Sequence, residues 1–378
     1  MVRAVHPETG PSGQDVDLPA RPGEIDPFIT RSRDPVKYRL FTAAETAMYW
    51  SGAAAVFSRV ALPPGAVVLT YHSVLAPGEE NFVDPSNALP ARQFERQMRF
   101  LSRRRRPTTM SRLVDDLAAD RPIRRGTVVV TFDDGYMDVL RAAAPVLTRY
   151  GVPAIVSLST GWIQDGVSPW IDRLYTAFKY RTRDEVSFAE IPGASRRFHN
   201  GEAVGVYHAI GEHCIPLPMA KRDELLGEVE RQLRPKSAMP KLIMNWDAVR
   251  TLVREHPGIE LGVHTVDHLD MTSCNDEQVH QQIQGSIDAV VREVGVRPLH
   301  FSFPFDRSDA RTRAIAKSCG VRSSVGAGYE GLAVRGADLY AIPRLSTTPR
   351  MNRLRFTTCG AYPELSRIML RRPKANGA

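Results

Sequence analysis

The sequence predicts an α/β protein whose core is an incomplete parallel (β/α) barrel of about seven strands. Strands alternate with helices along most of the chain, as in successive βαβ units. The run from Val128 to Val130 is apolar without alternation, which is typical of a parallel strand covered on both faces. A helix follows most of the strands, so the natural closure is a parallel barrel short of the usual eight strands.

The expected elements are short apolar runs separated by amphipathic stretches. The strands span residues 66–72, 128–132, 154–158, 260–264, 299–303, 321–325 and 339–345. The helices span residues 93–105, 114–117, 137–150, 245–253, 276–294 and 310–319. Gly151 is expected to stop the helix before it, and Asn245 is a plausible N-cap.

Residues 66–348 are expected to form the barrel, interrupted by an insertion at 161–244 that lies over the barrel mouth. Within the insertion we expect a helix at 170–178, a hairpin near 186–198 and a helix at 222–233. Residues 1–36, rich in Pro, Gly and acidic side chains, are expected to form an irregular arm. Residues 349–378 form a C-terminal tail.

Residues 37–65 are expected to form a helical extension. Its apolar stripe comprises Leu40, Ala44, Ala47, Met48 and either Ala54 or Val56. We expect the stripe to pack on the main domain, and peripheral binding to a membrane surface is the alternative.

The composition is that of a globular protein, with 43% hydrophobic and 24% charged residues. The net charge of +8 gathers in Arg103–Arg106, in Arg196–Arg197 and in the last residues. No nucleic-acid module accompanies these separate clusters, so we expect no nucleic-acid partner. A solvated face, an anionic glycan or a membrane surface accounts for the charge as well.

The four cysteines are widely spaced, which predicts neither a thiolate zinc site nor a disulfide scaffold and favours a reducing compartment. The first residues lack a basic start followed by an apolar core, so no secretory signal is expected. A cytoplasmic location, or one peripheral to the inner membrane, follows as an expectation. The oligomeric state is left open.

Two adjacent carboxylates, Asp133 and Asp134, follow the apolar run at the carboxyl end of its strand. Sheets and barrels of the α/β class place their chemistry at that edge. Consecutive strand residues point to opposite faces, so the pair can share a site only where the chain turns, and Gly135 permits a turn. For this stretch alone, a strand with an acidic turn and no function is the alternative.

A second strand end carries two histidines, His264 and His268. A turn or helical loop after Val263 would set both imidazoles on one side, within reach of one ion. One carboxylate and two histidines form a three-ligand set with open positions, the composition of a hydrolytic metal site. Two satisfied surface imidazoles are the alternative, which the combination with Thr131–Tyr136 disfavours.

The segments Thr131-Phe-Asp-Asp-Gly-Tyr136 and His264-Thr-x-x-His268, in this order and separation, resemble the motifs of the polysaccharide deacetylase family. Fainter similarities lie at 69–74, 301–305 and 339–345, so the resemblance covers roughly residues 66–348. Members of that family remove acyl groups from N-acetylated sugars and fold as a deformed (β/α) barrel.

Carried over by position, the resemblance implies that Asp134, His264 and His268 bind a divalent metal and that Asp133 is the catalytic base. Two histidines and a carboxylate suit Zn²⁺, although other divalent ions would bind them too. The implied partner is an N-acetylated carbohydrate.

The chain departs from the family pattern in two places. Ser302 stands where the family usually has an Arg that orients the base, and Asp306 stands where it has a Gly. Arg344 is the candidate replacement for orienting Asp133, with a surface ion pair as its alternative. No histidine occurs after His300, so the family's late general acid has no counterpart.

His72, at the end of the first strand, is the candidate proton donor, and a histidine satisfied by a backbone partner is the alternative. Sugar C–H faces pack on aromatic rings, so rings near strand ends are candidate substrate contacts. The candidates for substrate binding are Tyr136, Trp170, Phe303, Pro304 and Phe305.

The sequence therefore predicts a metal-dependent hydrolase that removes acetyl groups from N-acetylated sugars of a bacterial polysaccharide or its precursor. Activated water attacks the amide with Asp133 as base. A deacylase of a small-molecule or lipid-linked amide, with the same metal site, is one alternative. A catalytically inactive glycan-binding protein is the other, although binding alone does not require a base beside the metal.

Overall fold

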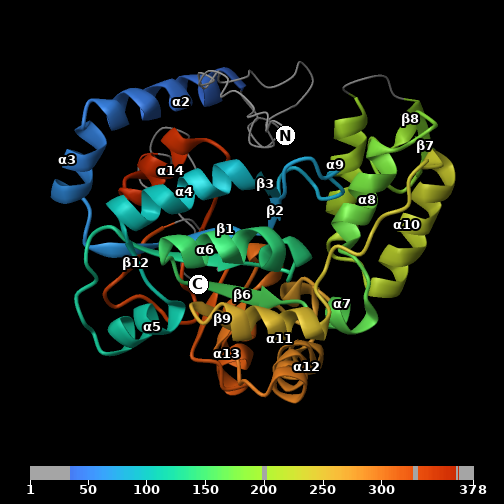
Figure 1. Cartoon of the computed structure of the whole chain (residues 1–378). Coiled ribbons are helices and arrows are strands. Elements are labelled where there is room, and N and C mark those ends of the chain that lie inside the picture. The colour runs from blue at the N-terminus through green and yellow to red at the C-terminus, as the bar shows by residue number, and fades with distance from the viewer. Residues whose placement is uncertain (1–34, 198–201, 327–330, 363–364, 366–378) are drawn as a thin grey trace, which may run out of the picture.

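The computed structural model describes residues 35–197, 202–326, 331–362 and 365 (Figure 1). Its centre is a sheet in which seven strands follow the order β11-β10-β9-β6-β5-β1-β12. These strands are β1 (Gly65–Tyr71), β5 (Thr127–Phe132), β6 (Ala154–Leu158), β9 (Ile259–Val263), β10 (His300–Ser302), β11 (Ser323–Val325) and β12 (Ala333–Val334). All pair in parallel except β12, which runs antiparallel to β1. The predicted incomplete parallel barrel is confirmed.

The barrel is nearly closed by the segment after β12, and here the sequence prediction is partly wrong. Instead of a strand over 339–345, the chain forms one bridge between Ile342 and Val325 and a short strand, β13 (Leu345–Ser346), parallel to β1. Pro343 lies between the two contacts and has no N–H to donate, so a continuous ladder cannot form there. The closing strand is thereby split.

Helices flank the sheet much as the sequence predicts. They are α4 (Ala91–Arg104), α5 (Met110–Ala118), α11 (Trp246–Glu255), α12 (Asp276–Val294) and α13 (Ala310–Ser318). The Asn245 side chain accepts a hydrogen bond from the Ala248 N–H, which confirms the predicted cap. The short strands β2 (Ser73–Leu75) and β3 (Ala88–Pro90) form a separate two-stranded sheet, and β4 (Arg106–Pro107) pairs with the start of β5.

The expected helix over 137–150 is divided into a π-helical turn (Val139–Ala143) and α6 (Ala144–Tyr150). Pro145, at the start of α6, has no N–H for a regular i to i−4 bond, so the wider turn precedes it. Gly151 ends α6 in the left-handed conformation with φ 61°, as predicted.

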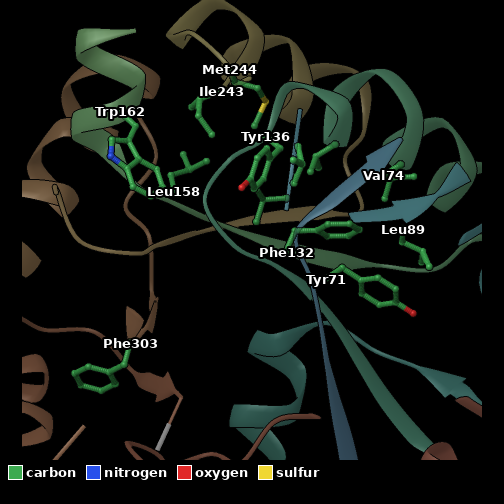
Figure 2. Close-up of a cluster of buried hydrophobic side chains, with 14 of the residues drawn as sticks. Tyr71, Val74, Leu89, Phe132, Tyr136, Leu158, Trp162, Ile243, Met244 and Phe303 are labelled. Atoms are coloured by element: carbon green, nitrogen blue, oxygen red, sulfur yellow. The ribbon is translucent and has the colours of Figure 1, made fainter. Parts of the chain in front are cut away.

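The core lies between the strands and their covering helices, where aromatic and aliphatic side chains gather (Figure 2). The Tyr71 ring stacks on Phe132 with centroids 5.5 Å apart, and both rings meet Phe94 of α4 edge-on. Full burial of such a side chain contributes about 1.5–3 kcal/mol. This cluster fixes β1 and β5 side by side, and those strands carry His72 and Asp133 at their ends.

Between β6 and α11 the chain forms α7 (Thr160–Asp165), α8 (Trp170–Lys179), the hairpin β7–β8 (Glu185–Ser187 and Ser195–Arg197), α9 (Ala203–Cys214) and α10 (Met219–Leu233). The predicted hairpin and the helices at 170–178 and 222–233 are confirmed, while α7 and α9 were not predicted. Phe198, at the end of the predicted hairpin, lies outside the described residues. Figure 1 shows α8, α9 and α10 grouped beside the end of the sheet toward which β6 points.

The predicted extension consists of two helices, α2 (Pro35–Trp50) and α3 (Ala53–Val60), separated by Gly52 at φ 76°. Of the predicted apolar stripe, Leu40 is 65% exposed and Ala47 is exposed too, so the prediction is wrong at these two positions. Ala54 is fully buried and Met48 packs on the core, as predicted, while the alternative Val56 is exposed. The inward side of α2 instead carries Glu45, whose carboxylate lies 2.6 Å from Arg353 of α14 (Met351–Thr358). Apolar periodicity does not reveal a buried ion pair, so the inward face was misassigned.

Residues 1–34 of the expected arm, and the tail beyond 365, lie outside the described residues. In the part of the chain that is described, no helix combines the length and apolarity needed to cross a bilayer.

Candidate metal and catalytic site

The predicted site residues converge at one edge of the sheet. Asp133 and Asp134 follow β5, His264 follows β9, and Ser302 ends β10. Because these strands are parallel, their carboxyl ends meet at the same edge. Only β6 lies between β5 and β9, so the aspartates and the histidines are one strand apart at this edge.

Asp134, His264 and His268 form a compact cluster with one ligand atom each within 4.8 Å of one another. The Asp134 Oδ1 atom lies 3.5 Å from the Nε2 atoms of both histidines. Two ligands about 2.0–2.1 Å from a tetrahedral ion lie roughly 3.3–3.4 Å apart, so one ion fits between them. Asp134 Oδ1 is also buried without a hydrogen-bond donor, and a metal ion would satisfy it.

The tautomer of His264 is set by its neighbour. Its Nδ1–H lies 2.7 Å from the Ser302 carbonyl oxygen and donates to it. Nε2 therefore keeps a free lone pair directed at Asp134, the arrangement in which a histidine binds a metal.

Electrostatics favour a cation at this cluster. Burial and the adjacent charge of Asp133 raise the pKa of Asp134 well above its usual range. Burial lowers the pKa of His264 and, more strongly, that of His268, so both imidazoles are neutral near pH 7. A divalent ion would remove the penalty on the Asp134 carboxylate and meet two neutral ligands.

The loops that carry the site have unusual backbone conformations. Asp134, Thr265, His268, Phe305 and Asp306 account for five of the seven non-glycine residues with positive φ in the described ranges. Gly135 has φ 89°, and this turn separates Asp134 from the line of its strand. Such conformations cost about 1–3 kcal/mol each and cluster at functional sites.

Asp133 is paired with a buried arginine. Arg344 lies 2.6 Å from Asp133 Oδ2, so the contact expected from the sequence is present. On its other side the Arg344 Nε–H donates to Asp306 at 2.5 Å, and the Ser302 hydroxyl donates to Asp133 at 3.3 Å. Burial would raise the pKa of Asp133, but Arg344 and the nearby histidines outweigh burial and hold it below its usual range. Asp133 is thus an ionised, oriented carboxylate beside the cluster.

Comparison with known families places the chain. Residues 120–324 match the family model described as polysaccharide deacetylase. The chain belongs to this family. A relative, YxkH of Bacillus subtilis (strain 168), whose name assigns it to the polysaccharide deacetylases, is 22% identical over 298 residues, covering 79% of this chain and 75% of the relative. The protein is therefore a hydrolase of the de-N-acetylase type, acting on amide carbon–nitrogen bonds of polysaccharides.

Solved structures agree on the fold. The deacetylase PplD of Streptococcus pyogenes superposes with a TM-score of 0.51 at 15% identity, over 79% of this chain and 99% of that one. IcaB of Ammonifex degensii gives 0.50 at 18% identity, over 79% and 97%. At these identities the likeness supports the barrel architecture of the deacetylase.

His72 is half-buried at the end of β1 and interacts electrostatically with Asp133 and Arg344. Burial lowers its pKa to about 4, against the opposing effect of Asp133. Free His72 in the deacetylase is therefore neutral at pH 7 and has to gain a proton before it can donate one to a leaving amine.

Two aromatic rings line the His268 side of the deacetylase site. Trp162 of α7 stacks on the imidazole at 4.9 Å between centroids, and Phe305 meets it edge-on at 4.7 Å. Trp162 was not predicted, although its place just after β6, at the same sheet edge, was a usable signal. These rings restrict the orientation of His268 and exclude water from one side of the cluster.

The predicted sugar contacts need correction. The Phe303 ring has no exposed surface and packs on Phe301, so it cannot contact a sugar. Tyr136 is 1% exposed, and its hydroxyl donates to Asp172 at 2.7 Å, so it is a core residue rather than a sugar platform.

Pro304 and Trp170 are buried too, and among the predicted contacts Phe305 alone is partly exposed. Trp170 packs between Arg222 of α10, 4.9 Å from its ring, and Phe305, and short-range sequence patterns do not reveal such contacts. Asp172, which anchors Tyr136, was also missed.

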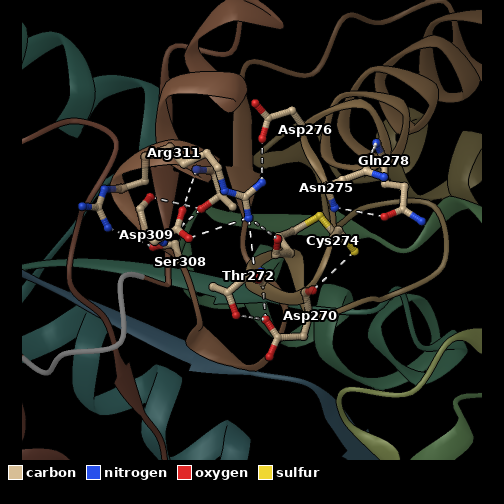
Figure 3. Close-up of polar contacts among 12 residues, drawn as sticks. Asp270, Thr272, Cys274, Asn275, Asp276, Gln278, Ser308, Asp309 and Arg311 are labelled. Carbon is tan, nitrogen blue, oxygen red and sulfur yellow. Dashed lines mark hydrogen bonds and ion pairs between the residues drawn. The ribbon is translucent and has the colours of Figure 1, made fainter.

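Polar contacts join the loop that follows His268 to the loop that follows Ser302. Arg307 pairs with Asp270 at 3.0 Å, and Arg311 pairs with Asp276 at 2.9 Å while donating to the carbonyls of Met271 and Thr272. Figure 3 shows Arg311 reaching across to the segment around Thr272 and Asp276. The loop that holds His268 is thereby tied to the start of α13.

Proposed function

We propose that this deacetylase is metal dependent, that Zn²⁺ suits its site, and that its substrate is an N-acetylated sugar unit of a bacterial polysaccharide or of its precursor. Asp134, His264 and His268 would hold the ion. The observation that carries the proposal is the buried Asp134 Oδ1 atom, without a donor and 3.5 Å from both imidazole Nε2 atoms. A divalent ion held there supplies Lewis acidity, which polarises the acyl carbonyl and acidifies water.

Asp133 is the proposed base. It is ionised, fully buried and adjacent to the ligand Asp134, so it can accept the proton of an attacking water without binding the ion itself. Arg344 holds Asp133 through Oδ2, and the Ser302 hydroxyl supports the same oxygen. Asp133 Oδ1 has no hydrogen-bond partner and remains free for the proton.

The leaving amine requires a proton, and two groups are placed to supply it. Asp133 carries one after it has acted as base, and His72 is the second candidate, as a carrier that first accepts a proton. Replacing His72 with Ala would separate the two: turnover collapses with metal content intact if His72 is the donor. An unchanged rate would leave the donation to Asp133.

We also propose that residues 66–348 form the catalytic unit and that residues 161–244 are an insertion over the site. Two contacts support this division: Tyr136 donates to Asp172 of α8, and the Trp170 ring lies 6.4 Å from Phe305. Both join the inserted helices to the loops that carry the proposed ligands and base.

The experiment is acetate release from N-acetylglucosamine oligomers, with and without a chelator, beside Asp133→Asn and Asp134→Ala variants. We expect chelator-sensitive release that is lost in both variants, with bound metal retained only in Asp133→Asn. If the metal-loaded protein releases no acetate from the oligomers, a small-molecule or lipid-linked amide substrate, or a glycan-binding role, would be favoured. Chelator-resistant release would refute the metal site.

A further inference from the structure

The helices α2 and α3 each expose an apolar stripe. Four of the eight large hydrophobic side chains that are strongly exposed in the described residues lie on them, with Leu40 and Trp50 each 65%, Val56 60% and Val60 83% exposed. The spacing is helical, so the stripe runs along one side of each helix. We call this stripe the outer face, and it comprises Leu40, Ala43, Ala47 and Trp50 of α2 with Ala53, Val56 and Val60 of α3.

The helices that carry the outer face are fixed to the rest of the protein. Glu45 and Arg353 form a buried ion pair at 2.6 Å between α2 and α14, and Ala54 of α3 is fully buried. The Arg125 guanidinium donates to the Ser58 and Leu62 carbonyls at the end of α3. The inward side is therefore occupied, and the outer face is presented on a rigid support.

Arginines border the outer face. Arg355 of α14 lies over the Trp50 ring at 5.2 Å and over the Phe100 ring of α4 at 5.8 Å, so α4 continues the same surface. Arg105 also lies over the Phe100 ring, at 4.9 Å. Arg59 of α3 is exposed beside Val60.

The solvent side of α4 adds a row of exposed basic residues, Arg92, Arg96, Arg99, Arg103 and Arg104. Carboxylates do not balance this charge. Within α2, α3, α4 and α14 the acidic residues are Glu45 and Glu95. Glu45 is buried with Arg353, and Glu95 is paired with Arg149 at 3.0 Å. The surface is thus apolar in the centre and strongly positive at its border.

We propose that the outer face and its arginine border dock on the surface of a bilayer that contains anionic phospholipid. An apolar helical face with a tryptophan enters the headgroup region, and surrounding arginines meet lipid phosphates. A second copy of the chain is a poorer occupant, because two such faces would bring like charges together. The proposal is independent of the metal site and of the substrate assigned above.

The test is co-sedimentation of the full-length protein with vesicles. One set contains phosphatidylglycerol and phosphatidylcholine in equal parts, and the other contains phosphatidylcholine alone. We expect at least tenfold tighter binding to the anionic vesicles, weakened by salt. The variant Trp50→Glu/Val56→Glu should lose at least tenfold of this binding. The matched control Val291→Glu/Val296→Glu, with side chains 40% and 46% exposed before substitution, should keep it.

Both variants are checked for an unchanged thermal melt and for unchanged acetate release from soluble oligomers, so that misfolding is not mistaken for lost docking. Equal vesicle binding by the wild type and the Trp50→Glu/Val56→Glu variant would overturn the proposal. So would absence of wild-type binding to either vesicle. A dimer that becomes monomeric in this variant, with vesicle binding unaffected, would assign the outer face to self-association.

Discussion

Replacing Arg344 with Gln tests the assignment of Asp133 as an oriented, ionised base. The substitution removes a guanidinium that is 6% exposed and lies 2.6 Å from a fully buried carboxylate. It leaves the Ser302 hydroxyl in place as a weaker contact at 3.3 Å. Asp133 then loses its guanidinium partner, and burial favours the protonated form of its carboxyl group.

The size of the effect follows from the pair's geometry. Two unit charges about 4 Å apart interact by about 4 kcal/mol at the effective dielectric constant of about 20 that suits protein sites. If that stabilisation of the ionised base is lost, the rate falls by up to about 10³-fold at acidic pH, where Asp133 of the variant is protonated. The pKa of Asp133 rises in the variant, because the positive charge that lowers it is gone. The deficit should therefore be largest in acid and shrink as the pH increases.

The assay is kcat/KM for acetate release as a function of pH, with metal content measured on the same samples. Arg344→Lys should be intermediate, since it keeps the charge but cannot hold both Asp133 and Asp306. The matched control is Arg335→Gln, whose ion pair with Asp120 is solvent-exposed on both sides. A deficit that is the same at every pH would refute the electrostatic reasoning, and an unchanged rate would remove Arg344 from the mechanism.

Three further predictions follow. Gly161→Ala should weaken metal binding at least tenfold in a competition titration, because its Cβ would lie 2.8 Å from the Val266 carbonyl in the histidine loop. Asp172→Asn should flatten the pH dependence of stability in urea unfolding. Burial raises the pKa of Asp172 to about 8, so its contribution is complete below pH 4 and is lost as the pH rises through 8. Removing the metal by chelation should lower the melting temperature, because Asp134 loses its counter-charge.

Each has a control. Gly227→Ala, on an open helical site with its nearest contact at 4.0 Å, should leave metal binding intact, and equal losses in both glycine variants would contradict the steric argument. An unaltered pH slope in Asp172→Asn would show that this carboxyl is ionised in the folded protein. A melting temperature insensitive to chelation and to added Zn²⁺ would argue against a resident ion.

The barrel and the proposed ligands could be predicted because their signals are local. The apolar run Val128–Val130, followed within four residues by Asp133 and Asp134, identifies a buried parallel strand and its functional edge. The spacing of His264 and His268 needs only one loop to bring both rings together. Helix caps such as Asn245 depend on a residue three positions away, so they too can be predicted from the sequence.

Features that depend on distant packing were missed or misassigned. Tyr136 was predicted to contact the sugar because it adjoins the motif. Its hydroxyl instead donates a hydrogen bond to Asp172 of α8, a helix in the insertion. The inward side of α2 was misjudged because Glu45 is neutralised by Arg353, more than 300 residues along the chain. The hydrophobic pattern of the sequence predicts neither the contact with Asp172 nor the contact with Arg353.

The Arg344 contact shows how a broken local rule can locate a site. Pro343 interrupts the closing strand, so β13 pairs with β1 and not with β11, and only one bridge joins Ile342 to Val325. The interruption falls next to Arg344, which lies beside Asp133, so the barrel's incomplete closure and the orientation of the proposed base share one cause. The positive φ values at Asp134 and His268 belong to the same edge. Such breaks and strained turns destabilise a barrel. Their concentration at one edge therefore indicates that this edge serves the chemistry of the protein rather than its stability.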